Sequence, residues 1–342
     1  MNRLVLVLLL VPFLPMRAQE RRLRLVEWNV ENLFDTVHDV GFNDREFLPD
    51  GAFGWDTRRY FTKLSMVSRT IAALGGVLPV DLIALCEVEN DSVLVQLTRR
   101  SLLARLGYEY VMTHGRDPRG IDVALLYQPL SFRPFSVRSL RVPQESAEEK
   151  PLRDILFVSG EIASGDTLHV FVCHLSSRLG GARATEPFRV RAAGVMRGCV
   201  DSLFADNPNA RIVITGDFND EPQNASIAKT LRAVTPPKEE STLADTALYV
   251  LTTRLKAADG VAGTYKFRGR WNRLDNVLVS TALLRSTGRL HTSERHCSIG
   301  VLPHLVERDS EQGGVKPRRA FLGTQWSGGV SDHLPIVLDL YF

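Results

Sequence analysis

The chain has 342 residues, of which 44% are hydrophobic and 24% charged, proportions typical of a soluble globular protein. Its length permits one large domain or two ordinary ones, and a chain of this size needs no disulfide framework or structural metal for stability. The formal net charge of +3 is too small to indicate a nonspecific nucleic-acid binder, which usually shows a clear basic excess. The four cysteines follow no metal-binding spacing, and we expect Cys86 and Cys173, in apolar runs, to be buried hydrophobic residues.

The first residues indicate export. Arg3 precedes an apolar run at residues 4–14, and the small residue Ala18 follows shortly after. A positive start, a short apolar core and a small residue at the end are typical of a secretory signal peptide. We therefore predict that residues 1–18 are removed and that the protein is exported, to a periplasm or out of the cell. The apolar run is short for a bilayer span. An uncleaved anchor is the alternative, whereas the cleaved protein would keep no integral membrane span.

Strand-like runs rich in Val, Ile, Leu and Phe recur along the chain and are too short to be helices. These predicted strands lie at residues 22–30, 81–88, 108–113, 122–127, 154–162, 168–175, 211–217, 274–280 and 335–341. Helical patterns lie between them at residues 57–74, 92–105 and 186–204, and the first has an apolar face with the i, i+3, i+4, i+7 spacing. No Pro/Gly/Ser-rich linker divides the chain, so residues 19–342 are predicted to form one α/β domain.

Two stretches lack a regular pattern, residues 40–56 and residues 304–327. Long irregular segments of compact domains are often functional lids, although a packed surface excursion is the alternative. The first stretch contains aromatic residues that we expect to pack within their own loop rather than to stack on bases: Phe42, Phe47, Phe53 and Trp55. The arginines of the last predicted helix are interpreted as a solvated face rather than a nucleic-acid stripe: Arg183, Arg189, Arg191 and Arg197.

Apolar strands repeatedly run into short polar clusters. These clusters contain Asn29, Glu87, His174, Asp217 with Asn219, Asp275, and Asp332 with His333. Several carboxylates buried together usually hold a cation, because an unpaired carboxylate loses its hydration at a large cost. Carboxylate and amide oxygens suit Mg²⁺ or Mn²⁺, and also Ca²⁺, better than Zn²⁺. A Mg²⁺ ion held by few carboxylates leaves room for a phosphate oxygen, which is what phosphoester hydrolysis requires.

Six elements together carry a family resemblance. They are Trp28-Asn29-Val30, Leu85-Cys86-Glu87, Val172-Cys173-His174, Gly216-Asp217-Phe218-Asn219, Leu274-Asp275 and Ser331-Asp332-His333-Leu334-Pro335-Ile336. Their order resembles the motif series of the endonuclease/exonuclease/phosphatase superfamily, which contains DNase I-like nucleases, abasic-site endonucleases, sphingomyelinases and inositol polyphosphate phosphatases. One such motif is weak evidence, but the whole series covers residues 28–336. The resemblance implies a DNase I-like, four-layered α/β sandwich, with two packed β-sheets flanked by helices and the site at the sheet ends.

The resemblance also implies metal and water-activating residues. Asn29 and Glu87 would bind the divalent metal, and Asp332 would lie close to it. Asp217 would position or deprotonate the attacking water. Asn219 would hold the phosphate and stabilise its transition state.

Further residues would contact the phosphate itself. His174 would donate to a phosphate oxygen, and His333, oriented by Asp275, would act as an acid–base group or a phosphate donor. Arg178 follows His174 closely, which favours substrate contact there. Arg119 opens residues 119–125, a segment that resembles a motif of exported bacterial members, and could meet a phosphate.

Single residues also have structural interpretations that involve no chemistry. Residues 217–220 could form a turn, His174 could be a satisfied core histidine, and Asp275 could pair with Arg273. Their occurrence in one ordered series favours the catalytic interpretation.

We therefore expect a monomeric, metal-dependent phosphoester hydrolase, favoured as an exported endonuclease that acts on nucleic acid by in-line attack of water. A phosphodiesterase or phosphatase acting on lipid headgroups or inositol phosphates is the main alternative. A catalytically silent binding module of the same fold is the second, but such a module would normally have lost one of the polar residues that this chain keeps.

Overall fold

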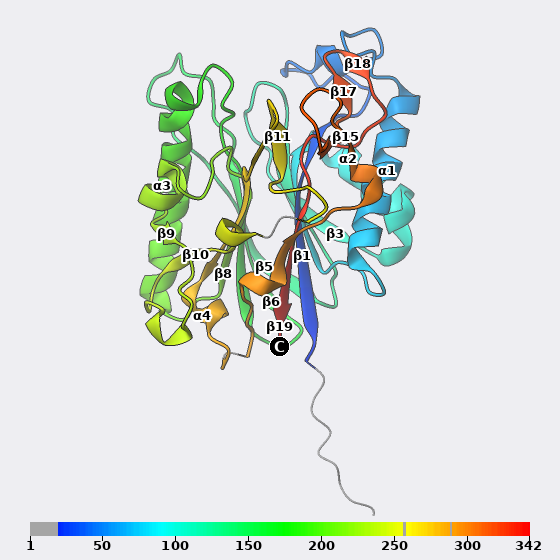
Figure 1. Ribbon diagram of the computed structural model, residues 1–342. Coiled ribbons are helices and arrows are strands. Elements are labelled where there is room, and N and C mark those ends of the chain that lie inside the picture. The colour runs from blue at the N-terminus through cyan, green and yellow to red at the C-terminus, as the bar shows by residue number, and fades with distance from the viewer. Residues whose placement is uncertain (1–19, 256–257, 288) are drawn as a thin grey trace, which may run out of the picture.

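The computed structural model describes residues 20–255, 258–287 and 289–342, so the predicted signal peptide lies outside the described residues. Two β-sheets face each other, with α1 (Thr57–Gly75) against the outer side of one sheet and α3 (Ala182–Asp206) against the other (Figure 1). Three apolar cores fill the spaces between these layers. The predicted four-layered α/β sandwich is confirmed. Within the described segments, no helix is long and apolar enough to cross a membrane.

The first sheet has six strands in the order β14-β19-β1-β2-β4-β3. Their bounds are Cys297–Ile299, Ile336–Tyr341, Arg22–Leu33, Leu82–Val88, Asp122–Tyr127 and Glu109–Met112. β1 and β2 are parallel, whereas the other pairs are antiparallel. β1 is buried on both faces, with Leu25 in the core between the sheets and Trp28 in the core under α1. This double burial explains its nearly continuous apolar sequence.

The second sheet has seven strands in the order β5-β6-β7-β8-β13-β10-β9. Their bounds are Phe132–Leu140, Ile155–Ile162, Thr167–His174, Ile212–Asp217, Asp275–Ser280, Leu248–Val250 and Ala233–Val234. β7 and β8 are parallel neighbours, and β13 runs antiparallel to β8. The parallel pairs β1–β2 and β7–β8 bring the ends of neighbouring strands to the same edge of the molecule.

Short elements complete the fold. Three hairpins pair β11 (Tyr265–Phe267) with β12 (Arg270–Asn272), β15 (Val306–Arg308) with β16 (Val315–Pro317), and β17 (Phe321–Leu322) with β18 (Gln325–Trp326). The remaining helices and helical turns are Arg45–Phe47, α2 (Asp91–Val95), Gln96–Arg100, Leu102–Leu106, Ala225–Thr230, Glu240–Thr242, Leu251–Arg254, α4 (Thr281–Leu284), Glu294–His296 and Pro303–Leu305. Residues 304–327, which lack a regular sequence pattern, thus contain two hairpins.

Two helix predictions differ in outcome. The helix predicted at residues 57–74 is confirmed as α1, whose Asp56 side chain accepts a hydrogen bond from Arg59 N at 2.8 Å and caps the first turn. The helix predicted at residues 92–105 is wrong as one continuous element. Ser101 adopts an extended conformation and its side chain caps a new turn, so the segment is α2 followed by two separate helical turns.

The predicted solvated arginine face of α3 is wrong for Arg189. This side chain is only 1% exposed, and its Nε lies 2.9 Å from Asp220 Oδ1. The pair ties α3 to the loop after β8, because that strand ends at Asp217 and Asp220 lies in the loop that follows. Phe47 stacks on Phe53 within the aromatic loop, as predicted, whereas Trp55 packs outside the loop, on Trp326, at 5.5 Å between ring centroids.

Candidate active site

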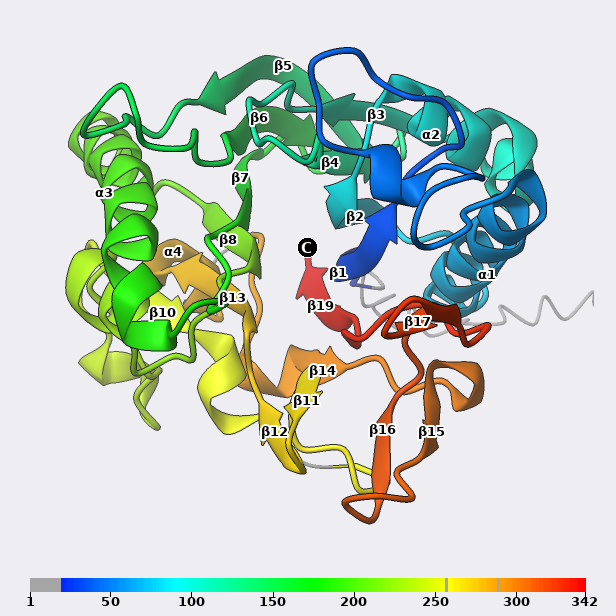
Figure 2. The ribbon, with the colours of Figure 1, turned by 90° about the horizontal axis from the view of Figure 1, so that it is seen from above.

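Strand register brings the predicted polar residues together at one end of the sandwich, which Figure 2 views from above. In the second sheet, His174 at the end of β7 is the register partner of Asp217 at the end of β8. Asp217 is in turn the register partner of Asp275, the first residue of β13. In the first sheet, Asn29 of β1 is paired with Cys86, the residue before Glu87 in β2. Side chains separated by nearly the whole sequence therefore meet between the two sheets.

Asp217 is the centre of this arrangement. Its Oδ2 accepts a hydrogen bond from Asn29 Nδ2 at 3.1 Å, and the same nitrogen donates to Glu87 Oε1 at 3.3 Å. His174 Nε2 lies 3.6 Å from Asp217 Oδ2 and 3.7 Å from Glu87 Oε1. Asn29, Asp217 and His174 are all buried. These contacts join the two sheets through polar groups that face a common point.

His333 is held beside this centre by three neighbours. Its Nδ1 lies 2.8 Å from Asp275 Oδ2, and its Nε2 lies 3.8 Å from Asp217 Oδ2. Its backbone N–H donates to Ser331 Oγ at 3.0 Å, and that hydroxyl donates to the carbonyl of Asn29 at 2.7 Å. The ring of Tyr265 lies 4.9 Å from the imidazole between centroids. The structure thus forms the predicted Asp275–His333 pair and points the free Nε2 at Asp217.

Asn219 completes the polar group through a tight turn. Its backbone N–H donates to Asp217 Oδ1 at 2.7 Å, and its side-chain Nδ2 donates to Asp217 Oδ2 at 3.2 Å. Arg178 Nε donates to the Asn219 carbonyl at 2.6 Å. The structure therefore places Arg178 as a support for the Asn219 turn, with its other end hydrogen bonded to Asn224 at 2.9 Å.

Backbone strain is concentrated at the same strand ends. Among the described non-glycine residues with positive φ are Glu31 (51°), Asn32 (52°), Glu87 (66°) and Asn219 (48°). Non-glycine residues rarely adopt this conformation, and such strain persists where the surrounding structure enforces it, often at functional sites. The strained backbone aims Glu87 into the site, where Asn32 N donates to its Oε2 at 2.7 Å.

Asp332 and Arg119 lie further from the centre. Asp332 Oδ2 accepts a hydrogen bond from Arg319 at 2.9 Å, so it is paired with a residue that the sequence pattern did not single out. Arg119 lies 3.7 Å from Asp117. Its charge nevertheless acts on Glu87, as described below.

The donor set fits a hard divalent cation. Glu87 offers a carboxylate, and Asn32 Oδ1 beside it is buried without a hydrogen-bond partner among the described residues. The Asn29 amide turns its Nδ2 toward Glu87, and its Oδ1 accepts from Glu31 N at 2.9 Å, so Asn29 would have to turn its amide to bind the ion. These oxygens are the ligands that Mg²⁺ and Mn²⁺ prefer. Asp217, Asp275 and His333 also have ligand atoms within 4.8 Å of one another. Because Asp275 already binds the imidazole Nδ1, we interpret these three as an acid–base relay rather than as a metal triad.

The two histidines have opposite electrostatic environments. Burial lowers the pKa of His174 well below its usual value, and the charges of Arg153 and Arg119 lower it further, so this ring is neutral. Burial also disfavours the charged form of His333. However, Asp275 and Asp217 outweigh that effect and hold its pKa well above the usual value. The site therefore contains one neutral imidazole and one imidazolium at neutral pH.

The carboxylates of Asp217 and Glu87 also differ in the direction of their pKa shifts. Burial raises the pKa of Asp217 to about 7, with Asp275 adding to the shift and His333 opposing it. For Glu87, burial favours the neutral form, but Arg119 and Arg153 outweigh it and hold the pKa below its usual value. Asp217 is thus suited to exchange a proton near neutral pH, whereas Glu87 stays ionised and suits a metal.

Residues that the sequence analysis did not assign also support the site. Lys63 is fully buried, and its Nζ donates to the carbonyl of Glu31. In the sequence, Lys63 interrupts the apolar face of the helix predicted at residues 57–74, and this pattern could have marked it as a buried residue. Arg153 Nε lies 2.9 Å from Asp117 and its charge reaches Glu87, but no local pattern marks this arginine.

The comparisons with known proteins agree with this geometry. A model of the endonuclease/exonuclease/phosphatase family matches residues 25–341, and the chain belongs to that family. The chain is therefore a phosphoester hydrolase, as members of this family are, and the family is divalent-metal dependent. No curated protein matches the chain in a sequence search.

Solved structures of the same superfamily resemble the chain in fold. A Bacteroides thetaiotaomicron endonuclease/exonuclease/phosphatase family protein is 16% identical, with 95% of this chain and 99% of that chain covered and a TM-score of 0.57. A mannosyl-6-phosphatase from the same organism is 17% identical, with 94% and 100% covered and a TM-score of 0.57. D. rerio TDP2 in complex with a single-stranded DNA product is 14% identical, with 93% and 98% covered and a TM-score of 0.56.

Proposed function

We propose that this phosphoester hydrolase is an exported nuclease that cleaves phosphodiesters of nucleic acid by in-line attack of water, with Mg²⁺ or Mn²⁺ as its ion. The observation that carries the proposal is the convergence of Glu87 and Asn29 from one sheet with Asp217 and His174 from the other, within 3.7 Å. Those four side chains combine a metal-binding carboxylate, a proton acceptor and a neutral donor in one place.

Glu87 and Asn29 would hold the divalent cation, which when bound neutralises phosphate charge and polarises the ester. Asp217 accepts a proton from the attacking water. Its pKa of about 7 makes the carboxylate an effective base near neutral pH. Asn29 and Asn219 both donate to Asp217 Oδ2, which fixes the orientation of this carboxylate.

The two histidines act as donors of different kinds. His333, kept charged by Asp275, directs Nε2 toward the centre, where it can bind a phosphate oxygen or protonate the leaving group. His174 remains neutral and directs its Nε2 to the same point, so it can donate to the phosphate without adding charge. Preorganised donors of this kind stabilise developing charge in the transition state.

The β11–β12 hairpin favours nucleic acid as the substrate. Tyr265 packs on His333, and Phe267, two residues further along β11, shares its side of the strand and is 55% exposed. Arg268 Cζ lies 5.2 Å from the centre of the Phe267 ring. An exposed aromatic ring with an arginine beside a phosphate site can stack a base and contact the backbone. An inositol phosphate offers no planar ring to such a surface.

The comparisons support the proposal only at the level of fold. TDP2 of D. rerio was solved with a DNA product, whereas the mannosyl-6-phosphatase is named for a sugar phosphate. Both are below 20% identity to this chain, so substrate choice rests on the hairpin. Export rests on the sequence pattern of residues 1–18.

A substrate panel tests the nuclease proposal. Single-stranded DNA, RNA, inositol phosphates, a sugar phosphate and sphingomyelin would be incubated with the protein in Mg²⁺ and in EDTA. We expect hydrolysis of nucleic acid that EDTA abolishes and Mg²⁺ restores. Efficient hydrolysis of a sugar or inositol phosphate without nuclease activity would overturn the choice of substrate.

A matched pair of variants tests the hairpin. Phe267→Ala should raise the KM for single-stranded DNA by about 10-fold through loss of stacking, with little change in kcat. Phe135→Ala is the control, because Phe135 is 64% exposed on β5 but lies outside the site. Equal KM values for both variants and the unmodified protein would exclude the hairpin from substrate binding.

For export, the N-terminal residue of the expressed protein should be Gln19, and a retained Met1 would contradict cleavage.

A further inference from the structure

A second group of acidic residues lies beside the active site, on the α1 side of the first sheet. Asp35 follows β1 and Glu89 follows β2, and these parallel neighbours place the two residues together, with Asp35 N donating to Glu89 Oε2 at 2.6 Å. The following loop folds back so that Asp39 N donates to Asp44 Oδ2 at 2.7 Å. We name Asp35, Asp39, Asp44 and Glu89 the acidic cluster. None of the four has a role in the proposed catalysis.

The negative charge of the acidic cluster is poorly compensated. Among the described residues, no lysine or arginine nitrogen lies within 4.0 Å of its carboxylates, and His38 Nδ1, at 2.5 Å from Asp44 Oδ1, is the one basic neighbour. Asn90 contributes a neutral amide, which donates to Asp39 Oδ2 at 3.0 Å. Asp220, another buried acid, by contrast meets Arg189 at 2.9 Å. A buried carboxylate without such a partner either takes up a proton or meets a cation.

Tyr60 of α1 gives an independent indication of a ligand. This residue is 4% exposed, and its hydroxyl is buried without a hydrogen-bond partner in the described part of the chain. Burial raises the pKa of this hydroxyl, and the negative charges of Asp35 and Glu89 raise it further, so these two carboxylates of the acidic cluster lie near it. A buried tyrosine hydroxyl usually has a partner. A hydrated cation among the carboxylates would supply one, because its bound water can hydrogen bond to the phenol.

We propose that the acidic cluster binds a Ca²⁺ ion, separate from the catalytic cation. The donors are carboxylate oxygens on a loop and on a strand end, which suits an ion with many oxygen ligands and flexible geometry better than the strict octahedron of Mg²⁺. Among the described residues, Asp217, Asp275 and His333 form the one group of three whose ligand atoms lie within 4.8 Å of one another, so no three carboxylates of the acidic cluster lie as close together as that. Binding of an ion must therefore draw the loop of Asp39 and Asp44 closer to Glu89.

This ion would stiffen one wall of the active site. The same loop carries Phe42, whose ring packs against Gly120, and Asn43, whose N–H donates to the Pro118 carbonyl at 2.7 Å. These contacts reach the segment around Arg119, the arginine that keeps Glu87 ionised. The expected effect of Ca²⁺ is thus on stability first and on catalysis only indirectly.

Thermal unfolding of the Glu87→Gln protein tests the proposal, because this substitution weakens the catalytic metal site and activity is not the readout. Millimolar Ca²⁺ should raise the Tm by several degrees, since a ligand of the folded state stabilises by mass action. Adding Asp39→Asn should raise the Ca²⁺ concentration needed for half of this shift at least ~10-fold. Asp50→Asn is the control, because Asp50 is an exposed acid of the same loop.

The direction in which Asp39→Asn changes the Tm in EDTA provides a second readout. Without Ca²⁺, Asp39→Asn should raise the Tm, because it removes one of several like charges, and this result also shows that the variant folds. A Ca²⁺-induced shift that persists unchanged in Asp39→Asn, or no shift in the Glu87→Gln protein, would overturn the proposal.

Discussion

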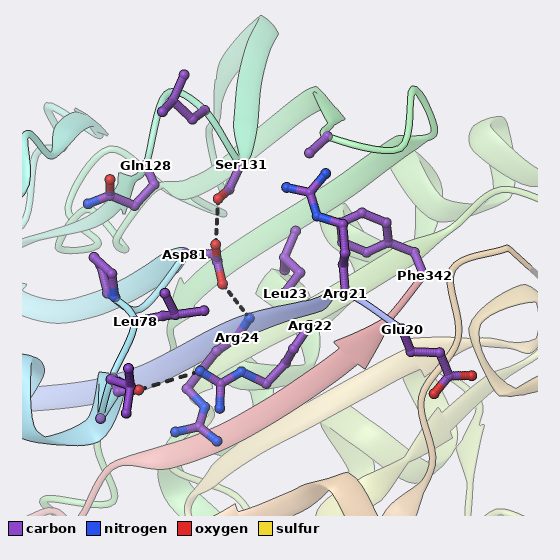
Figure 3. A pocket seen from close by; sticks show the side chains of 16 residues that line it. Glu20, Arg21, Arg22, Leu23, Arg24, Leu78, Asp81, Gln128, Ser131 and Phe342 are labelled. Atoms are coloured by element: carbon purple, nitrogen blue, oxygen red, sulfur yellow. Dashed lines mark hydrogen bonds between the residues drawn. The ribbon is translucent and has the colours of Figure 1, made fainter. Parts of the chain in front are cut away.

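The two ends of the sandwich differ in how their charges are satisfied. At the catalytic end, Asp217, Glu87 and His174 face one another across distances of 3.6 to 3.7 Å. At the opposite end a hollow of about 960 Å³ is lined by the first strand and the C-terminus (Figure 3). There Arg24 makes two hydrogen bonds of 2.7 Å to Asp339. The partly buried charge of Arg24 beside this hollow is therefore paired. The active site is therefore recognised by its buried charged groups that face one another, and not by the volume of a hollow.

The largest expected effect is the loss of His333 at the catalytic end. His333→Ala should reduce kcat at least ~10²-fold, because it removes a charged donor that faces Asp217. Steady-state hydrolysis of a phosphodiester measures this change. His296→Ala is the control, since His296 packs on Tyr341 away from the site. A rate close to that of the unmodified protein would remove His333 from the mechanism.

The pH profile should separate the two titrating groups. Asp217 acts when deprotonated, so kcat/KM should rise as pH increases through about 7. His333 acts when protonated, so activity should fall once pH exceeds its raised pKa. Asp275→Asn removes the main charge that raises this pKa, and it should move the alkaline limb to lower pH by about 1–3 units. An alkaline limb that stays in place would contradict the assignment of the His333 proton.

At the opposite end we expect stability to change without activity. Asp339→Asn removes the charge that Arg24 binds, and the free energy of unfolding should fall by about 1–3 kcal/mol. Denaturant unfolding measures the loss, and kcat/KM at saturating Mg²⁺ should remain within about two-fold. A large fall in kcat/KM for the folded variant would show that the two ends are coupled.

The smallest expected effect is the loss of an exposed ion pair, measured as the free energy of unfolding. Arg133 and Glu161 lie 2.8 Å apart on the surface of the second sheet. Glu161→Gln should change the free energy of unfolding by at most ~0.5 kcal/mol, because solvent screens exposed pairs. A loss as large as that of Asp339→Asn would undermine the distinction between buried and exposed pairs.

The sequence predicted much of this architecture. Strands such as β4 at Asp122–Tyr127 coincide with their apolar runs, because both faces are buried and the runs are nearly continuous. The polar residues at the strand ends were recognised by their order, and the register confirms that His174, Asp217 and Asp275 are neighbours.

What the sequence did not reveal depends on contacts distant in the chain. β5, at Phe132–Leu140, contains a proline and exposed residues, as edge strands often do, so it lacked a clear pattern. The pairing of Asp332 with Arg319 and the burial of Arg189 against Asp220 both depend on the folded arrangement of loops. No local spacing encodes these pairs.

Glu87 is proposed to hold the cation that hydrolysis requires. The most direct measurement is the Mn²⁺ concentration that gives half-maximal hydrolysis, compared between the unmodified protein, Glu87→Gln and Asp339→Asn. Glu87→Gln should need at least ~10-fold more Mn²⁺, whereas Asp339→Asn should need the same amount as the unmodified protein. Equal Mn²⁺ requirements for all three proteins, or full activity in EDTA, would contradict this role of Glu87.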